Sequence, residues 1–215
     1  MKKLLLLFIL LFNLTLPVKA KVMPYYVNSI NPNSIGVFQT QNKIRVYKEP
    51  NEKSELLFEV NWDKESFNCP EVSAGNLFAV FFPKKDLAFL TVIDENEDEE
   101  WVQISFNKDG LKNGWVKKYD RYRFMNWRTF FNLYGRKYGL YYLKDTPDEY
   151  KVMYGTPAKD AKSIGKITMP QTLKLTSVSG NWLLIIAYDI DKYQKIGWIK
   201  WRNISGQIFL FPDIK

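Results

Sequence analysis

Apolar and polar residues alternate over short stretches along most of the chain, which is the pattern of half-buried β-strands. One such pattern occurs twice: an apolar strand opened by Trp, a polar turn, and a second strand that begins Gly-Trp. The first copy comprises residues 101–105 and 114–117, and the second comprises residues 182–186 and 197–200. Each copy predicts a β-hairpin. The chain is therefore predicted to hold a duplicated small β module.

Further strands are predicted on both sides of the two hairpins, between turns rich in Pro, Asn, Asp and Gly. In the first half they cover residues 35–38, 43–47, 56–60, 77–82 and 87–93. In the second half they cover residues 140–143, 152–154, 163–167, 173–175 and 208–211. The first module is also predicted to hold an insertion, residues 62–100, with strands 77–82 and 87–93 as its hairpin. The acidic run that closes this insertion lacks the ligand spacing of a calcium loop and predicts a solvated turn.

Residues 119–138 have a different pattern, with aromatic side chains at helical spacing and basic residues between them. The aromatic positions are Phe124, Trp127, Phe131 and Tyr134. This pattern predicts an amphipathic linker helix over residues 119–138, with Gly135 as a candidate stop signal. A flexible tether would be rich in glycine, serine or charge. We therefore expect this helix to pack against the modules and to fix one relative to the other.

The N-terminal residues 1–20 have a basic start, an apolar run broken at Asn13, and the exit Val18-Lys19-Ala20. These are the parts of a secretory signal peptide. The apolar run is shorter than the roughly 20 residues that a spanning helix needs. We predict cleavage and no stable membrane insertion afterwards. The mature protein is expected in the periplasm, or outside the cell in association with the wall, and residues 21–34 are expected to form an extended lead-in.

The amino-acid composition limits which ligands and which catalytic chemistry the protein can use. The chain carries a formal net charge of +8, and loss of residues 1–20 removes three lysines and no acid, which leaves +5. That balance favours anionic envelope polymers. Cys69 is the only cysteine, so no intramolecular disulfide forms, and the chain has no histidine. Without histidine the usual general base and the commonest zinc ligand are missing, and no cofactor or metal is predicted.

Three arrangements that could carry catalysis or nucleic-acid binding are weaker than their structural alternatives. Ser105 with Lys108 and Ser163 with Lys166 match Ser-x-x-Lys, but that motif needs a helix and these pairs fall on predicted strands or turns. Asp189 and Asp191 could form a carboxylate pair only in a cleft, and turn chemistry explains them. The basic and aromatic stretch 121–137 resembles a nucleic-acid-binding surface. Because the protein is expected to be exported, we predict no nucleic-acid partner.

The repeated segments resemble the bacterial SH3-like domain family. The residues that carry the resemblance are 44–50, Trp101 and Gly114-Trp115-Val116 in copy one, and 153–157, 163–165, Trp182 and Gly197-Trp198-Ile199 in copy two. The resemblance implies an all-β fold with a short linker helix: two small, partly open SH3-like β-barrels in tandem, the first with a β-hairpin insertion. The implied domains are residues 35–118 and 139–215. Family members occur on exported proteins and bind peptidoglycan or other envelope components.

We therefore expect an exported, non-catalytic protein whose tandem modules bind a cell-envelope ligand, either peptidoglycan or an anionic wall polymer. Two weak sites on one chain would raise avidity. The candidate ligand-binding residues are aromatic: Tyr47, Trp101, Trp115, Tyr154, Trp182, Trp198 and Trp201. Tyr47, Tyr154 and Trp201 are expected to be the most exposed of them. The alternative is an envelope adaptor that binds another exported protein through an apolar patch on the insertion, and a wall hydrolase is the least favoured function.

Overall fold

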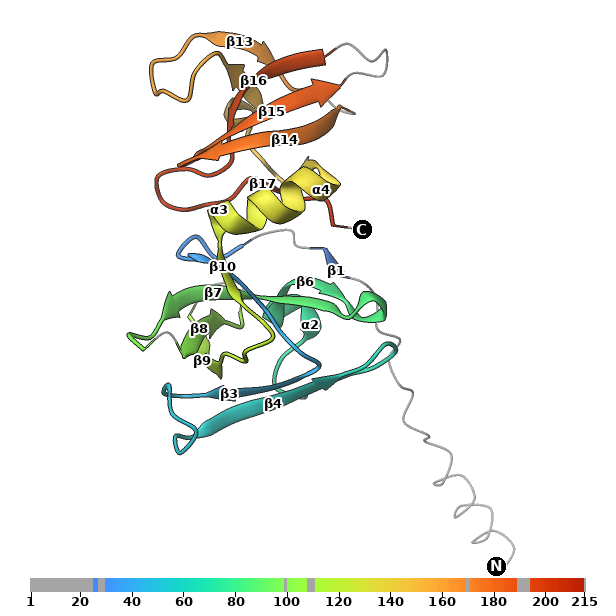
Figure 1. Cartoon of the computed structure of the whole chain (residues 1–215), viewed down its shortest axis with the longest axis vertical. Coiled ribbons are helices and arrows are strands. Elements are labelled where there is room, and N and C mark those ends of the chain that lie inside the picture. Colours follow the sequence, from blue (N-terminus) through green and yellow to red (C-terminus); the bar gives the residue numbers. More distant parts are fainter. Residues whose placement is uncertain are drawn as a thin grey trace, which may run out of the picture.

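The computed structural model describes residues 25–26, 30–98, 100–107, 111–168, 171–188 and 194–214. Most of this part of the chain forms two antiparallel β-sheets, with one short helix between them (Figure 1). The expectation of a mainly β fold with a linker helix is therefore confirmed. The described part of the chain contains no helix with the length and apolar character needed to cross a bilayer. The predicted signal peptide lies outside the described residues.

The N-terminal sheet is built from the first half of the chain. Its strands are β1 (Tyr25–Tyr26), β2 (Gly36–Gln39), β3 (Lys43–Tyr47), β4 (Leu56–Trp62), β5 (Phe67–Asn68), β6 (Phe78–Phe82), β7 (Leu87–Glu95), β8 (Trp101–Ser105), β9 (Asn113–Lys117) and β10 (Phe124–Asn126). The short helix α2 (Ala74–Leu77) leads into β6, and the 3-10 turn η1 (Pro83–Lys85) follows it.

The second half forms the helix and the C-terminal sheet. The helix has three consecutive parts: α3 (Trp127–Phe130), the π-helical turn η2 (Phe131–Gly135) and α4 (Arg136–Tyr138). The strands are β11 (Leu140–Tyr142), β12 (Val152–Tyr154), β13 (Ser163–Lys166), β14 (Thr172–Ser179), β15 (Trp182–Tyr188), β16 (Gln194–Lys200) and β17 (Leu210–Pro212). The 3-10 turn η3 (Asp148–Lys151) precedes β12.

The two sheets repeat one strand order. Neighbouring strands run β4-β3-β9-β8-β7 in the first sheet and β13-β12-β16-β15-β14 in the second. In addition, β2 pairs with both β7 and β10, as β11 pairs with both β14 and β17. The predicted hairpins are confirmed as the pairs β8–β9 and β15–β16. Neither strand order returns to its first strand within the described residues, so neither sheet is a closed barrel.

The repeat also holds at the level of single residues. Tyr47 pairs with Trp115 next to a bulge in β3, and Tyr154 pairs with Trp198 next to a bulge in β12. A close approach of strands accompanies each pair, because a Cβ on Gly114 would lie 3.0 Å from the Tyr47 carbonyl oxygen. The backbones that flank the hairpins match too. The Lys118 N–H donates to the backbone carbonyl oxygen of Glu100 at 2.8 Å, and the Trp201 N–H donates to the backbone carbonyl oxygen of Asn181 at 3.1 Å.

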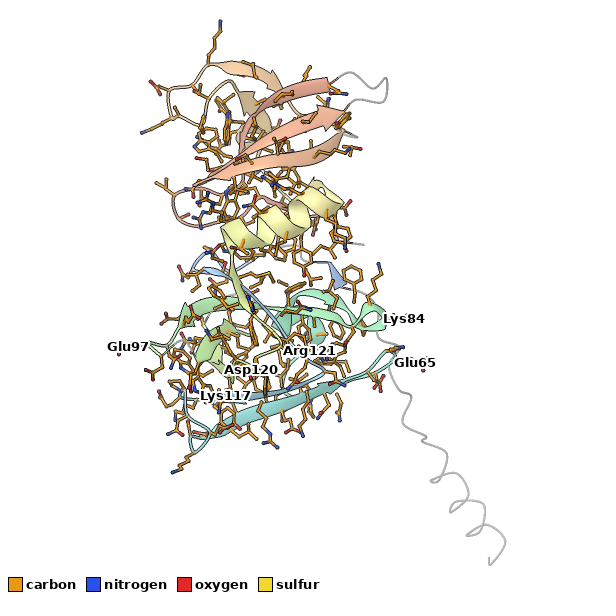
Figure 2. All side chains as sticks on the ribbon, viewed as in Figure 1. Glu65, Lys84, Glu97, Lys117, Asp120 and Arg121 are labelled. Atoms are coloured by element: carbon orange, nitrogen blue, oxygen red, sulfur yellow. The ribbon has the colours of Figure 1, made fainter. Side chains whose placement is uncertain are left out.

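The strand order corrects the extent of the insertion. Strand β7 occupies the place that β14 occupies in the second sheet, so it belongs to the repeat. The segment without a counterpart is therefore residues 63–86, and not the predicted 62–100. A single sequence could not separate these cases, since β6 and β7 do form the predicted hairpin. The acidic turn after β7 is exposed at Glu97, which lies at its outer tip (Figure 2).

The helix starts later than predicted, at Trp127, and ends at Tyr138 as predicted. Residues 124–126 form strand β10 against β2, because Gly36 lets the two backbones approach. Asn126 then caps the helix, its Oδ1 accepting from the Thr129 N–H at 3.0 Å. The helix passes through Gly135 and ends before Gly139, whose φ of +82° suits glycine. Gly135 instead provides room for packing, since a Cβ there would lie 2.9 Å from Leu175.

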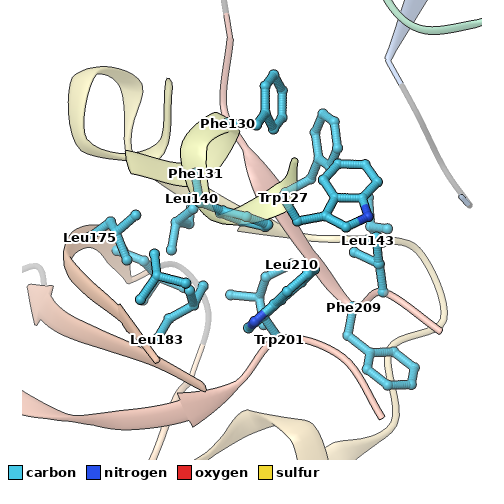
Figure 3. Packing of buried hydrophobic residues seen from close by; sticks show 14 of the residues in the cluster. Trp127, Phe130, Phe131, Leu140, Leu143, Leu175, Leu183, Trp201, Phe209 and Leu210 are labelled. Carbon is cyan, nitrogen blue, oxygen red and sulfur yellow. The ribbon is translucent and has the colours of Figure 1, made fainter. Parts of the chain in front are cut away.

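One hydrophobic cluster joins the helix to both sheets. It contains Val37 and Phe89 of the N-terminal half, Trp127 and Phe130 of the helix, and a larger group from the C-terminal half. That group includes Leu140, Leu175, Leu183, Trp201, Phe209 and Leu210, and Figure 3 shows it gathered beneath the helix. The Phe130 ring contacts Phe89 of the N-terminal half at 5.4 Å and Phe211 of the C-terminal half at 5.4 Å. The helix is thus a shared core element and not a tether.

Candidate ligand-binding site

An aromatic pair and a lysine form the same arrangement in each copy. In the second copy the Tyr154 and Trp182 rings meet edge to face, with centroids 5.3 Å apart. The Lys200 ammonium lies 5.1 Å from the Trp182 ring centroid and 5.9 Å from that of Tyr154. These are cation–π distances, so the lysine is held over the aromatic surface.

The first copy repeats this geometry. The Tyr47 and Trp101 rings meet edge to face at 5.7 Å, and both aromatic pairs have an interplanar angle of 85°. The Lys117 ammonium lies 6.0 Å from the Trp101 ring. Both trios arise from the strand pairing, which sets Trp101 opposite Lys117 and Trp182 opposite Lys200.

The predicted aromatic residues differ in their exposure. Tyr154, Trp182, Trp115 and Trp198 are partly exposed. In contrast Tyr47 is 8% exposed, Trp101 5% and Trp201 1%. The expectation that Tyr47 and Trp201 are exposed was therefore wrong. Trp201 is buried because its ring packs 4.7 Å from Phe131 of the helix, a contact that only the tertiary fold creates.

A groove of about 250 Å³ lies beside Trp182 in the second copy. Its described lining consists of Tyr150, Lys159, Asn181, Trp182, Lys200, Arg202, Asn203 and Ile204. Three of these side chains are cationic and none is acidic. Trp182 was predicted as a ligand-binding residue from the aromatic pattern, whereas the basic residues of the groove were not predicted. The available signal was the repeat itself, because Lys200 ends the Gly-Trp strand in the same way as Lys117.

Arg202 is held in place at the groove. Its Nε donates to the Asn181 Oδ1 at 2.6 Å, and its guanidinium lies 4.6 Å from the Trp201 ring centroid. Burial lowers the pKa of Arg202 from its ordinary value. An arginine remains charged at neutral pH despite such a shift. The guanidinium is thus a preorganised cation for an incoming anion.

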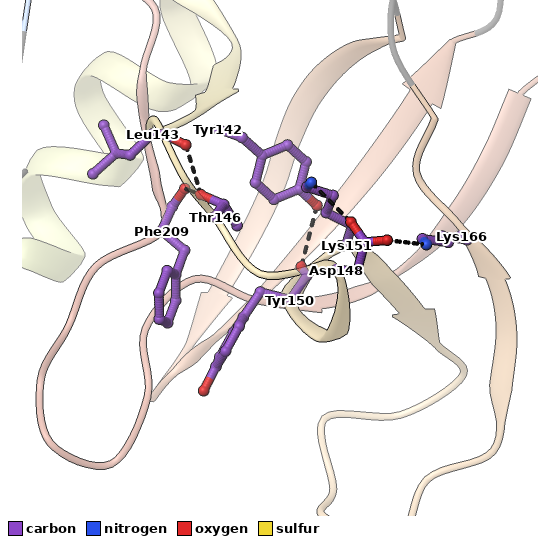
Figure 4. A network of polar contacts seen from close by, with 8 residues as sticks. All are labelled: Tyr142, Leu143, Thr146, Asp148, Tyr150, Lys151, Lys166 and Phe209. Atoms are coloured by element: carbon purple, nitrogen blue, oxygen red, sulfur yellow. Dashed lines mark hydrogen bonds and ion pairs between the residues drawn. The ribbon is translucent and has the colours of Figure 1, made fainter. Parts of the chain in front are cut away.

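Lys200 has no acidic partner among the described residues, since none of their carboxylates forms an ion pair with it. Two other lysines of the second copy share one acidic partner. Asp148 accepts from Lys166 at 2.7 Å and from Lys151 at 3.0 Å, and Figure 4 shows its carboxylate between them. The hydrogen bonds from Lys166 and Lys151 lower the pKa of Asp148 to about 2. The groove, in contrast, holds three cations and no acid among its described lining residues.

The matching place in the first copy is a larger groove of about 530 Å³ that carries acids. Its charged lining consists of three acids, Glu95, Glu100 and Asp120, and three bases, Lys117, Lys118 and Arg123. Both lysines are paired: Lys117 with Glu52 at 3.3 Å, and Lys118 with Glu95. Figure 2 labels Lys117 and Asp120 on this face of the N-terminal half.

Ser163 and Lys166 do not form the geometry needed for Ser-x-x-Lys chemistry. Ser163 and Lys166 lie on strand β13, where residues three apart point to opposite faces, and Lys166 binds Asp148. For the other pair, Lys108 lies outside the described residues, as do Asp189 and Asp191. Burial raises the pKa of the Cys69 thiol, which keeps it protonated at neutral pH. The described residues contain no cluster of acids and cysteine suited to a metal ion.

No family model matches the chain, and neither a curated protein nor a solved structure matches it.

Proposed function

We propose that the protein is an exported, non-catalytic binding protein whose SH3-like repeats serve the cell envelope. Its ligand is peptidoglycan or an anionic polymer of the wall, held in the groove of the second copy. The observation that carries this proposal is the groove's charge: Lys159, Lys200 and Arg202 surround Trp182, and no acid stands among the described lining residues.

The groove suits a sugar unit that bears an anionic group. A carboxylate or phosphate would accept hydrogen bonds from the two lysines and from Arg202, which is already oriented by Asn181. A sugar ring would lie against the partly exposed face of Trp182. The groove is smaller than the roughly 300–1,000 Å³ typical of small-molecule pockets. It therefore fits one unit of a polymer better than a whole small ligand.

One sequence feature and one structural feature support the rest of the proposal. Residues 1–20 have the pattern of a cleaved export signal. The five-strand order shared by both sheets, with a Gly-Trp strand beside the Trp-opened strand, is what two related SH3-like modules would require.

The test is cosedimentation of residues 21–215 with purified wall sacculi at physiological salt. One batch of sacculi retains its anionic polymers, and in another they are removed by hydrogen fluoride. Retention on the first batch alone identifies a phosphate-bearing polymer, while retention on both identifies peptidoglycan. If the protein sediments with neither batch, the proposal is overturned.

A matched pair of variants shows that the groove is responsible. Lys200→Ala removes a cation from the groove, whereas Lys84→Ala removes one from the exposed turn η1 and leaves the same net charge. We expect only Lys200→Ala to weaken sedimentation. Equal retention of the two variants would mean that net charge alone drives the binding.

The envelope adaptor is the second candidate. It was linked to an exposed apolar patch on the insertion hairpin. Strand β6 is buried at every position from Phe78 to Phe82, so its apolar side chains serve the core. No observation on the insertion therefore favours an adaptor over the polymer binder.

A further inference from the structure

This inference rests on the proposed function and defines which copy performs it. We infer that only the second copy binds an anionic ligand, and that acids of the first copy occupy the equivalent groove in the ligand's place. The protein is then a single-site binder, and not the tandem binder that the duplication suggests.

Glu52 and Lys159 occupy equivalent positions in the corresponding loops of the two copies. Each stands five residues after the repeated tyrosine, Tyr47 or Tyr154. The same backbone hydrogen bond closes both loops. The Lys48 N–H donates to the backbone carbonyl oxygen of Glu55 at 2.9 Å, and the Gly155 N–H donates to that of Lys162 at 3.3 Å. A turn inside each loop matches as well: the Ser54 N–H donates to the Asn51 carbonyl oxygen, and the Ala161 N–H donates to the Ala158 carbonyl oxygen. The loops thus have one length and one fold, while the charge at this position is reversed.

The reversal changes the state of the repeated lysine. In the first copy the Glu52 carboxylate lies 3.3 Å from the Lys117 ammonium. In the second copy Lys159 lines the groove together with Lys200. A carboxylate of the chain itself therefore contacts the first lysine, and the second is left for an anion from outside.

Three further positions of the groove change in the same direction. The backbone bonds at the hairpin bases make Glu100 the counterpart of Asn181. Counting on from the paired strands makes Tyr119 the counterpart of Arg202, and Asp120 that of Asn203. The first copy thus has two acids where the second has amides, and it has a tyrosine where the second has a guanidinium. Four positions of the groove thus favour anions in the second copy, and one changes in the opposite direction, because Ile204 of the second groove corresponds to Arg121 in the first copy.

The exposure of the aromatic pair also differs between the two copies. Trp101 is 5% exposed and Tyr47 8% exposed, while Trp182 and Tyr154 are partly exposed. The first copy therefore offers little ring surface for a sugar. What the first copy retains is its packing, through Tyr47, Trp101 and the paired strands, which suits a structural role.

The experiment exchanges the groove residues between the copies of the mature protein. The converted variant carries Glu52→Lys, Glu100→Asn, Tyr119→Arg and Asp120→Asn. The reversed variant carries Lys159→Glu, Asn181→Glu and Asn203→Asp, and Lys159→Glu alone serves if the triple change lowers the melting temperature. The probes are tetragalacturonate and inorganic tetraphosphate, with maltotetraose as the neutral match. Calorimetric titration gives the number of sites, and the Trp101 and Trp182 indole signals in NMR spectra give their location.

We expect the wild-type protein to bind one molecule of an anionic probe with a shift of the Trp182 signal. The reversed variant should bind at least tenfold more weakly, and the converted variant should gain a second site that shifts Trp101. Two sites in the wild type, or a converted variant that still has one, would overturn the inference and leave the proposed function standing. A wild-type protein that binds neither anion would also overturn the inference, and only one that in addition fails to sediment with sacculi would contradict the proposed function itself.

Discussion

The indole Nε1–H of Trp127 donates to the backbone carbonyl oxygen of Ser34 at 2.9 Å. Ser34 precedes β2 of the N-terminal sheet, and the bond ties the start of the helix to that half. The same indole ring lies 6.2 Å from Trp201 and 6.2 Å from Phe211 of the C-terminal half. Trp127 is 3% exposed, so one side chain joins the two halves through a buried hydrogen bond and through packing.

Replacement of Trp127 by Ala should lower the free energy of unfolding by about 3–5 kcal/mol, because it leaves a large cavity and an unpaired carbonyl oxygen. It should also increase the radius of gyration, since the cluster that holds the halves together is broken. Denaturant titration and solution scattering measure these effects. Leu133→Ala is the control, because Leu133 lies on the same helix and is 56% exposed. Equal behaviour of both variants would show that the helix is not the joint.

Replacement of Gly36 by Ala should destabilise the fold through backbone crowding. A Cβ at this position would lie 2.2 Å from the Met125 carbonyl oxygen, and no side-chain rotation relieves that clash. Strands β2 and β10 must move apart, at a cost of about 1–3 kcal/mol or more. Gly165→Ala is the matched control in a strand, because nothing lies within 4 Å of its added Cβ. A melting temperature unchanged by Gly36→Ala would contradict the observed pairing.

The Asp148 carboxylate should give a pH-dependent contribution to stability. Hydrogen bonds from Lys166 and Lys151 lower its pKa from 3.8 to about 2. A lowered folded-state pKa stabilises the fold above the unfolded value, and this contribution is lost as pH falls from about 4 to about 2. Asp148→Asn should therefore differ from the wild type at pH 7 and converge with it near pH 2, with a smaller difference in high salt. Parallel stability curves at all pH values would rule out this role.

The proposed binding to the wall should depend on Lys200 and not on Lys117. Lys200 has no acidic partner among the described residues, whereas Lys117 is already paired with Glu52. Loss of a charge-assisted hydrogen bond costs about 1.5–3 kcal/mol, so Lys200→Ala should weaken binding by about tenfold or more. Lys117→Ala should change it by less than about twofold. The affinity of each variant for sacculi measures this, and a larger effect of Lys117→Ala would move the site to the first copy.

Local patterns were sufficient to predict the hairpins. Alternation and the Gly-Trp signals predicted β8–β9 and β15–β16, because a strand pair with a short turn depends on residues close in sequence. The aromatic spacing predicted the helix, but not that residues 124–126 are a strand, since that depends on contact with the distant Gly36. The same limit applies to β7, which periodicity assigned to the insertion and strand order assigned to the repeat.

The sequence alone determined the duplication, the β class of the fold and the absence of histidine chemistry, because composition and local periodicity encode them. Only the tertiary structure decided which aromatic residues are exposed, since Trp201 is covered by Phe131 of a separate element. It also decided the candidate site. Lys159, Lys200 and Arg202 come from separate parts of the chain, and their common charge acts on a ligand only because strand pairing places them around one groove.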